Sequence, residues 1–121
     1  MPKGKNKENY KNYYLRLNDT YFGGSLSKDI IVSESLKMRR KAGVCYFHSF
    51  SSGLIEPFEI CLSKQYLSVY PLDLVGVLLH EMIHIKLKNN LHNFEYQKEV
   101  NNFYQDFGII IPIIGKQLSD D

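Results

Sequence analysis

The apolar side chains near the start of this chain are spaced like those of a helix. Between residues 10 and 21 they recur at steps of three and four, which places them on one face of an α-helix. Gly23 and Gly24 are expected to end this helix, because glycine readily adopts the left-handed backbone found after a helix. The residues before Glu8 are polar and rich in lysine, so residues 1–8 are expected to form a flexible basic N-terminus.

Three short apolar runs with strand character follow. The first covers residues 30–32 and is β-branched, the second covers residues 43–50 and is rich in aromatic residues, and the third covers residues 58–62. Between the last two runs, residues 51–53 have the sequence Ser-Ser-Gly, which predicts a turn. A small antiparallel sheet is the expected result.

The next part of the chain returns to helical patterns. Ser63 is placed to cap a short helix that ends near Val69, and Pro71 then opens a longer one. This longer helix runs from Leu72 to about Lys88 and is apolar on nearly every face. Such a pattern predicts a buried helix, in which any polar side chain needs a reason to be present.

The last elements complete the predicted fold. Residues 94–107 predict a further helix, with Gly108 at its C-terminus. The apolar run at residues 109–114 contains Pro112 and predicts an extended segment or an edge strand. Together the patterns predict an α+β fold in which a small antiparallel sheet packs against helices.

Size and composition favour one globular domain. The chain has 121 residues, 44% hydrophobic and 23% charged, so a single ordinary core is expected over residues 9–121. Its two cysteines, Cys45 and Cys61, are too few for a disulfide framework or a zinc site of four thiolates, and both are expected to be buried. No apolar run is long enough to span a bilayer and no signal peptide is evident, so no membrane partner and a cytoplasmic location are expected.

Charge is distributed unevenly along the chain. The net charge is +2, but residues 1–41 contain ten basic and four acidic side chains, whereas residues 42–121 contain five basic and nine acidic ones. A basic segment can attract a polyanion such as DNA, although a solvated turn is the alternative interpretation. Four neighbouring cations are the candidate DNA contacts: Lys37, Arg39, Arg40 and Lys41.

The predicted buried helix contains a His-Glu-x-x-His motif formed by His80, Glu81 and His84. A step of four residues places the two histidines one above the other, so both imidazoles can bind one metal ion. Glu81 is turned about 100° from His80, so its carboxylate can take a proton from a metal-bound water without being a ligand. The motif predicts a catalytic zinc site, and the alternative is three polar side chains satisfied at one end of a helix.

A catalytic zinc site needs a third protein ligand. His92 is preferred, because a turn at residues 89–90 lets the chain fold back over the first two histidines. Glu95 and Glu99 are the alternatives, since the gluzincin pattern takes a glutamate from a later helix. His48 lies in the sheet region and is expected to be a sheet residue and not a ligand.

Several segments resemble the SprT-like metalloprotease domain, the family that includes the Spartan protease domain. Residues 18–26 look like the end of the family's N-terminal helix, and residues 42–45 like the strand after its basic segment. Residues 60–63 resemble the short strand before the active-site helix, and residues 77–84 that helix itself. Residues 92–96 are similar to the later stretch that supplies a third histidine, with Asn for Gly and Tyr for Phe.

The resemblance implies a zinc metalloendopeptidase with one zinc ion per chain. In it His80, His84 and His92 bind the metal, Glu81 acts as the catalytic base, and the substrates are proteins or peptides, including proteins bound or crosslinked to DNA. No Cys-x-x-Cys pair follows the motif, so the zinc ribbon that some members append is not expected. The competing hypothesis is a zinc-stabilised DNA-binding or scaffold module without protease activity. Glu81 argues against it, because a purely structural zinc site has no use for that carboxylate.

Overall fold

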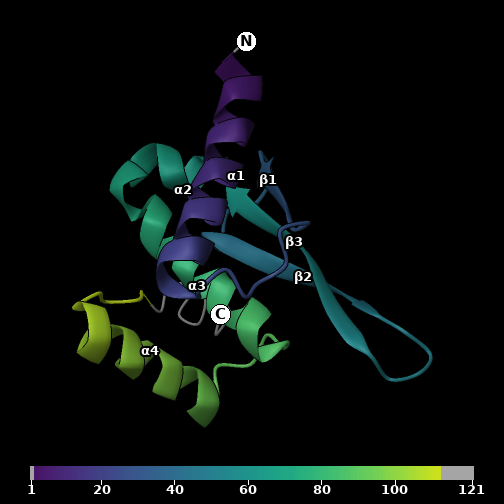
Figure 1. Ribbon diagram of the computed structural model, residues 1–121. Helices are drawn as coiled ribbons and strands as arrows, with labels where there is room; N and C mark the ends of the chain where they lie inside the picture. Colours follow the sequence, from purple (N-terminus) through teal and green to yellow (C-terminus); the bar gives the residue numbers. More distant parts are fainter. Residues whose placement is uncertain (1, 113–121) are drawn as a thin grey trace.

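A computed structural model describes residues 2–112 of the chain, with side chains from Tyr10 onward (Figure 1). The element order in this part is α1 (Pro2–Tyr21), β1 (Ile31–Ser35), β2 (Gly43–Ser49), β3 (Ile55–Ser63), α2 (Lys64–Val69), the 3₁₀ turn η1 (Pro71–Asp73), α3 (Leu74–Leu87) and α4 (Phe94–Phe107). The predicted α+β class is confirmed. None of the helices in this part is long and apolar enough to cross a membrane.

The sheet of the described residues has three strands in the order β1-β3-β2. β2 and β3 form the predicted antiparallel hairpin, in which Cys45 pairs with Ile60, and a bulge separates Tyr46 from Phe47. β1 instead runs parallel to β3, with Val32 paired to Ile60. The sheet is therefore mixed, and the expectation that all strands are antiparallel was wrong for β1. A parallel neighbour needs a long connection, and here the whole of β2 lies within it.

The ends of α1 agree with the sequence pattern at one side only. The helix ends at Tyr21 as predicted, and Gly23 and Gly24 follow with φ angles of 62° and 72°. It begins at Pro2, earlier than Tyr10, the first residue of the predicted helical pattern. The two glycines turn the chain toward β1 because their missing Cβ atoms make the left-handed backbone accessible.

Two predicted caps are confirmed. The Ser63 hydroxyl accepts a hydrogen bond from the backbone N–H of Tyr66 and so begins α2. Gly108 follows α4 with a φ angle of 69°, and its N–H donates to the carbonyl oxygen of Tyr104 at 2.9 Å. Residues 109–112 form neither helix nor strand, and residues 113 and 114 of the predicted extended run lie outside the described part.

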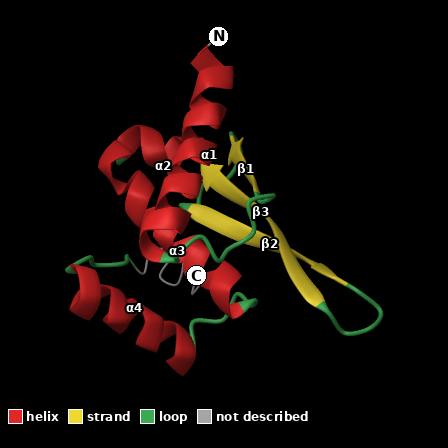
Figure 2. Ribbon diagram, viewed as in Figure 1, coloured by secondary structure: helices red, strands yellow, loops and turns green. Residues whose placement is uncertain are grey.

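The helices pack together at one end of the sheet, and the outer part of the β2–β3 hairpin extends beyond them (Figure 2). α1 contacts β1, α3 contacts β2 and β3, and α4 packs against α3. α3 is therefore covered by the sheet and by two helices, which explains why it is apolar on nearly every face. Leu78, Leu79, Met82 and Ile83 of α3 are completely buried.

Candidate metal centre

The buried helix α3 carries two histidines and a glutamate in the middle of its length. His80 and His84 lie one helical turn apart and are 3% and 2% exposed, and Glu81 between them is 4% exposed. Burying three such polar groups among apolar neighbours is unfavourable unless each is satisfied or neutral. Both histidines have hydrogen-bond partners, and no described side-chain nitrogen or oxygen that is fully buried lacks one.

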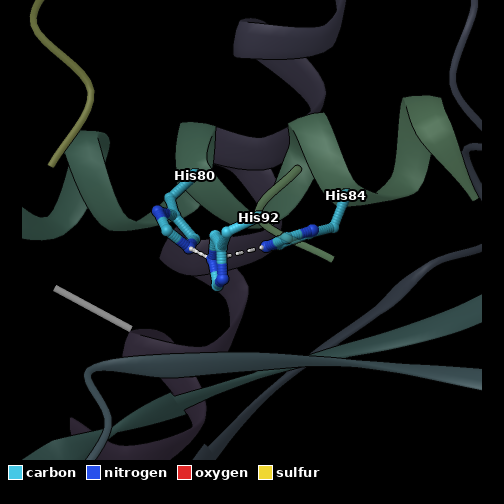
Figure 3. Close-up of side chains that lie close together, drawn as sticks. All are labelled: His80, His84 and His92. Carbon is cyan, nitrogen blue, oxygen red and sulfur yellow. Dashed lines mark hydrogen bonds between the residues drawn. The ribbon is translucent and has the colours of Figure 1, made fainter. Parts of the chain in front are cut away.

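Three imidazoles converge on one point (Figure 3). The Nε2 atom of His92 lies 3.1 Å from Nε2 of His80 and 3.3 Å from Nε2 of His84. The predicted third histidine thus stands beside the first two, and the three form a cluster able to hold a metal ion. His92 comes from the segment just before α4, whereas His80 and His84 belong to α3.

Two backbone carbonyls fix the orientation of the helix histidines. Nδ1 of His80 lies 2.7 Å from the carbonyl oxygen of Pro112, and Nδ1 of His84 lies 3.0 Å from that of Asn89. A carbonyl oxygen can only accept, so the proton of each ring must be on Nδ1. The Nε2 atoms of His80 and His84 consequently carry lone pairs that face the centre of the cluster.

Burial keeps these histidines neutral. It lowers the pKa of His80 from 6.5 to about 4, although the hydrogen bond to Pro112 opposes the change. Burial also lowers the pKa of His84 to about 3, and the neighbouring His80 and His92 add to the effect. Neutral imidazole is the form that binds a metal ion, so at neutral pH these two ligands need not lose a proton first.

The loop after α3 brings His92 into place. Lys88 ends the helix in the left-handed conformation, with a φ angle of 61°, and the chain reverses there. The side chain of Asn90 donates to the carbonyl oxygen of Cys45 at 3.0 Å and thereby ties the loop to β2. Asn93 then caps α4 by accepting from the backbone N–H of Tyr96 at 3.0 Å. His92 is held between these two anchors.

Tyr96 contacts all three histidines of the cluster, a role that the sequence patterns did not predict. Its ring stacks on His84 with the ring centres 4.6 Å apart, and its hydroxyl donates to the carbonyl oxygen of His80 at 3.2 Å. Because this hydroxyl is bound to the main chain of α3, Tyr96 fixes the position of the ligands and does not face a substrate. The available signal was an aromatic residue four positions after His92, which is one helical step along the chain.

Glu81 lies in the same pocket as the three histidines. Burial raises the pKa of its carboxyl group from 4.5 to about 8, and the nearby ammonium group of Lys41 opposes the rise. The pocket has a volume of about 210 Å³, and its remaining walls come from the basic segment, β2 and the loop after α3. These residues are Lys41, Gly43, Val44 and Asn90.

The other candidate residues lie apart from the cluster. Glu95 is exposed, and Glu99 forms an ion pair with Lys86 at 2.8 Å, so neither belongs to it. His48 is exposed on β2 and stacks against Phe58 with 3.8 Å between ring centres, as expected for a sheet residue.

The four candidate DNA contacts occupy the connection between β1 and β2. Lys37, Arg39, Arg40 and Lys41 are all exposed there, and Lys41 is the one that lines the pocket. The predicted burial of the cysteines holds for Cys45, whereas Cys61 is partly exposed.

The donor set fits a zinc ion. Bonds of 2.0–2.1 Å in tetrahedral geometry hold two nitrogen ligands about 3.3 Å apart. The His80–His92 and His84–His92 separations, 3.1 and 3.3 Å, are close to this value, and all three ligand atoms lie within 4.8 Å of one another. Without a cation, at least two lone pairs meet at this point, because His80 and His84 carry their protons on the other nitrogen. The cluster is thus arranged to hold a positively charged ion.

Comparison with known proteins places the chain in a family. No curated protein matches it. The family model of the SprT-like family matches residues 10–110, which include the second part of α1, the sheet, the histidine cluster and α4. Family membership and the three-histidine group indicate a metallopeptidase-like domain with a site that can hold a metal ion. The chain belongs to the SprT-like family.

Proposed function

We propose that this protein is a zinc-dependent endopeptidase. The observation that carries the proposal is the convergence of three imidazole nitrogens beside a buried carboxyl group in one pocket. His80, His84 and His92 would hold the ion, which leaves one position of a four-coordinate site for water or substrate. A bound zinc ion would supply Lewis acidity, polarising the scissile carbonyl group and lowering the pKa of water.

Glu81 is the general base of the proposed reaction. Its carboxylate accepts a proton from the attacking water as the oxygen adds to the peptide carbonyl carbon, and then delivers that proton to the leaving amine as the C–N bond breaks. Burial favours the protonated carboxyl group, whereas the ammonium group of Lys41 and a divalent cation would both favour the carboxylate. Proton transfer in either direction is therefore accessible near neutral pH.

β2 is placed to align a peptide with this machinery. It is an edge strand of the described sheet, and Gly43 and Val44 form a wall of the pocket. A substrate in extended conformation can add to such an edge through main-chain hydrogen bonds, which accept many sequences. The side chain of Asn90 already donates a hydrogen bond to the carbonyl oxygen of Cys45, so a shorter part of the β2 edge remains open to a peptide.

The exposed basic segment supports a role on proteins that are bound or crosslinked to DNA. Lys37, Arg39 and Arg40 are exposed in the same connection as Lys41, which lines the pocket, and as they do not line it themselves they can contact phosphates without filling the site. If DNA binds there, peptide cleavage should rise on adding DNA and fall as salt is raised, because phosphate contacts weaken with ionic strength. Cleavage that responds to neither change would remove the DNA part of the proposal.

The central experiment compares the wild type with Glu81→Gln. Each protein is assayed for bound zinc by elemental analysis and for cleavage of casein or histone. We expect one zinc ion per chain in both proteins and cleavage by the wild type alone, because glutamine keeps the shape of Glu81 but cannot accept the proton. One zinc ion per chain with cleavage by neither would favour the scaffold alternative.

A further inference from the structure

The segment that follows α4 reaches back to the metal centre. This segment, residues 109–112, is called the strap below. Ile111 is buried in the core, whereas Ile110 is 77% exposed. The side chain of Ile111 therefore anchors the strap. Its last residue, Pro112, lies against α3 and places its carbonyl oxygen 2.7 Å from Nδ1 of His80.

A glycine on α3 makes room for the strap. A Cβ atom added to Gly76 would lie 3.1 Å from Cδ and 3.3 Å from Cγ of Pro112, closer than such atoms normally approach. Gly76 precedes His80 by one helical turn, so the two residues share the face over which the strap passes. Glycine in a helix interior is unfavourable for helix formation, and the close approach of Pro112 gives a reason for it here.

We propose that the strap is a positioning element for the metal centre, with Pro112 as the positioning residue for His80 and Gly76 as the gap that admits it. The inference rests on the proposed metal-binding function. The Pro112 carbonyl holds the proton of His80 on Nδ1 and sets the ring angle, so that the Nε2 lone pair points at His84 and His92. Pro112 lies beyond residues 10–110, which match the family model, so the family match does not include it.

Ordinary packing makes a different prediction from positioning. If the strap only packs, the new methyl group of Gly76→Ala crowds Pro112, so the variant should lose stability to the extent that helix propensity does not offset the crowding, and zinc affinity should stay unchanged. If the strap positions His80, the added methyl group pushes Pro112 and its carbonyl away, and metal affinity falls while the metal-free protein stays folded. Stability and affinity then change independently.

The experiment measures zinc affinity by competition with a chromophoric chelator, together with the thermal midpoint of the metal-free protein. We expect Gly76→Ala to bind zinc about tenfold more weakly, the lower end of the range for losing a group that orients a ligand. Its midpoint should stay close to that of the wild type, because the gain in helix propensity offsets the cost of shifting the strap. Ile110→Ser changes an exposed side chain of the same strap and is the matched control, with unchanged affinity expected.

A second substitution tests the route of the effect. Pro112→Ala removes the ring atoms that collide with the new methyl group but keeps the main-chain carbonyl. In the Gly76→Ala background it should restore zinc affinity to within about threefold of the wild type. Replacing zinc with cobalt(II) adds a spectroscopic readout, since the visible absorption bands should shift in Gly76→Ala and return in the double variant.

The outcomes separate this proposal from the function on which it rests. A wild type that binds no zinc overturns both. A wild type that binds zinc with a Gly76→Ala variant of equal affinity overturns the strap alone, and so does a weakened Gly76→Ala variant that Pro112→Ala fails to rescue. Loss of affinity together with a lower midpoint of the metal-free protein also counts against positioning, because general unfolding would then explain it.

Discussion

The metal-free protein should be most stable near pH 6.5, because the metal centre holds two buried histidines and a buried glutamate whose pKa values are shifted in opposite directions. Burial lowers the pKa of His80 to about 4 and that of His84 to about 3, from 6.5. It raises the pKa of Glu81 from 4.5 to about 8. In the unfolded chain these groups titrate near their ordinary values, so folding changes how many protons each one holds.

The direction of each contribution follows from which state binds the proton. Between pH 6.5 and 4 the two histidines bind protons only in the unfolded chain, so the unfolding free energy decreases as pH falls. Between pH 4.5 and 8 Glu81 holds its proton only when folded, so the stability it contributes is lost as pH rises. Each proton of difference changes the unfolding free energy by about 1.4 kcal/mol per pH unit.

These terms combine into a profile with two slopes. From pH 6.5 down to 4.5 the two histidines outweigh Glu81 by one proton, so stability should fall by about 1.4 kcal/mol per pH unit. From pH 6.5 up to 8 Glu81 acts alone, and the loss should total about 2 kcal/mol. All three groups are almost fully buried, so solvent screening reduces these figures little.

Urea denaturation of the chelator-treated protein between pH 5 and 8 measures this profile. Glu81→Gln should lose the decline above pH 6.5 and show about twice the wild-type slope below it, because glutamine does not titrate and no longer offsets one of the two histidine protons. Wild-type stability that rises steadily from pH 6.5 to 8, or an alkaline decline that persists in Glu81→Gln, would refute the reasoning.

Three further predictions concern the ligand set and the packing around it. His92→Ala should weaken zinc binding by more than about 100-fold, the upper range for groups that only orient a ligand, whereas Glu95→Ala should leave it unchanged; the reverse result in a chelator competition would make Glu95 the ligand. Asn18→Ala should lower the unfolding free energy by about 2 kcal/mol in urea denaturation. The Asn18 side chain is fully buried, donates to the carbonyl oxygen of Leu26 and accepts from the backbone N–H of the same residue. A loss smaller than about 0.5 kcal/mol would contradict this. Gly43→Ala should cost about 1–2 kcal/mol in the same assay, since its new Cβ would lie 3.0 Å from Cγ1 of Val77, and an unchanged midpoint would show that β2 and α3 can separate freely.

The sequence predicted most elements of the fold because their signals are local. α4 occupies Phe94–Phe107 as expected, since its apolar periodicity and terminal glycine are both read within one segment. The orientation of β1 could not be predicted in this way. A short β-branched run has the same pattern beside a parallel or an antiparallel neighbour, and its partner is chosen by packing with α1 and β3.

The candidate site divides along the same line. The spacing of His80 and His84 follows from helix geometry. The turn before α4 made His92 the preferred third ligand, and in the structure the three histidines form one cluster. The carbonyl groups that orient the ligands were out of reach, because every residue has a carbonyl and only the folded chain decides which one meets an imidazole. The entry of Lys41 into the pocket likewise depends on how β2 lies against α3.

The position of the strap also bears on when the metal centre matures during synthesis. The three histidines leave the ribosome close together, within residues 80–92, whereas the carbonyl group that orients His80 belongs to residue 112 and follows later. A nascent chain can thus gather its three imidazoles around an ion before their geometry is complete. On the proposed function, tight binding then waits for α4 to form and for the strap to pack over Gly76, and retention of a metal would be coupled to completion of the fold.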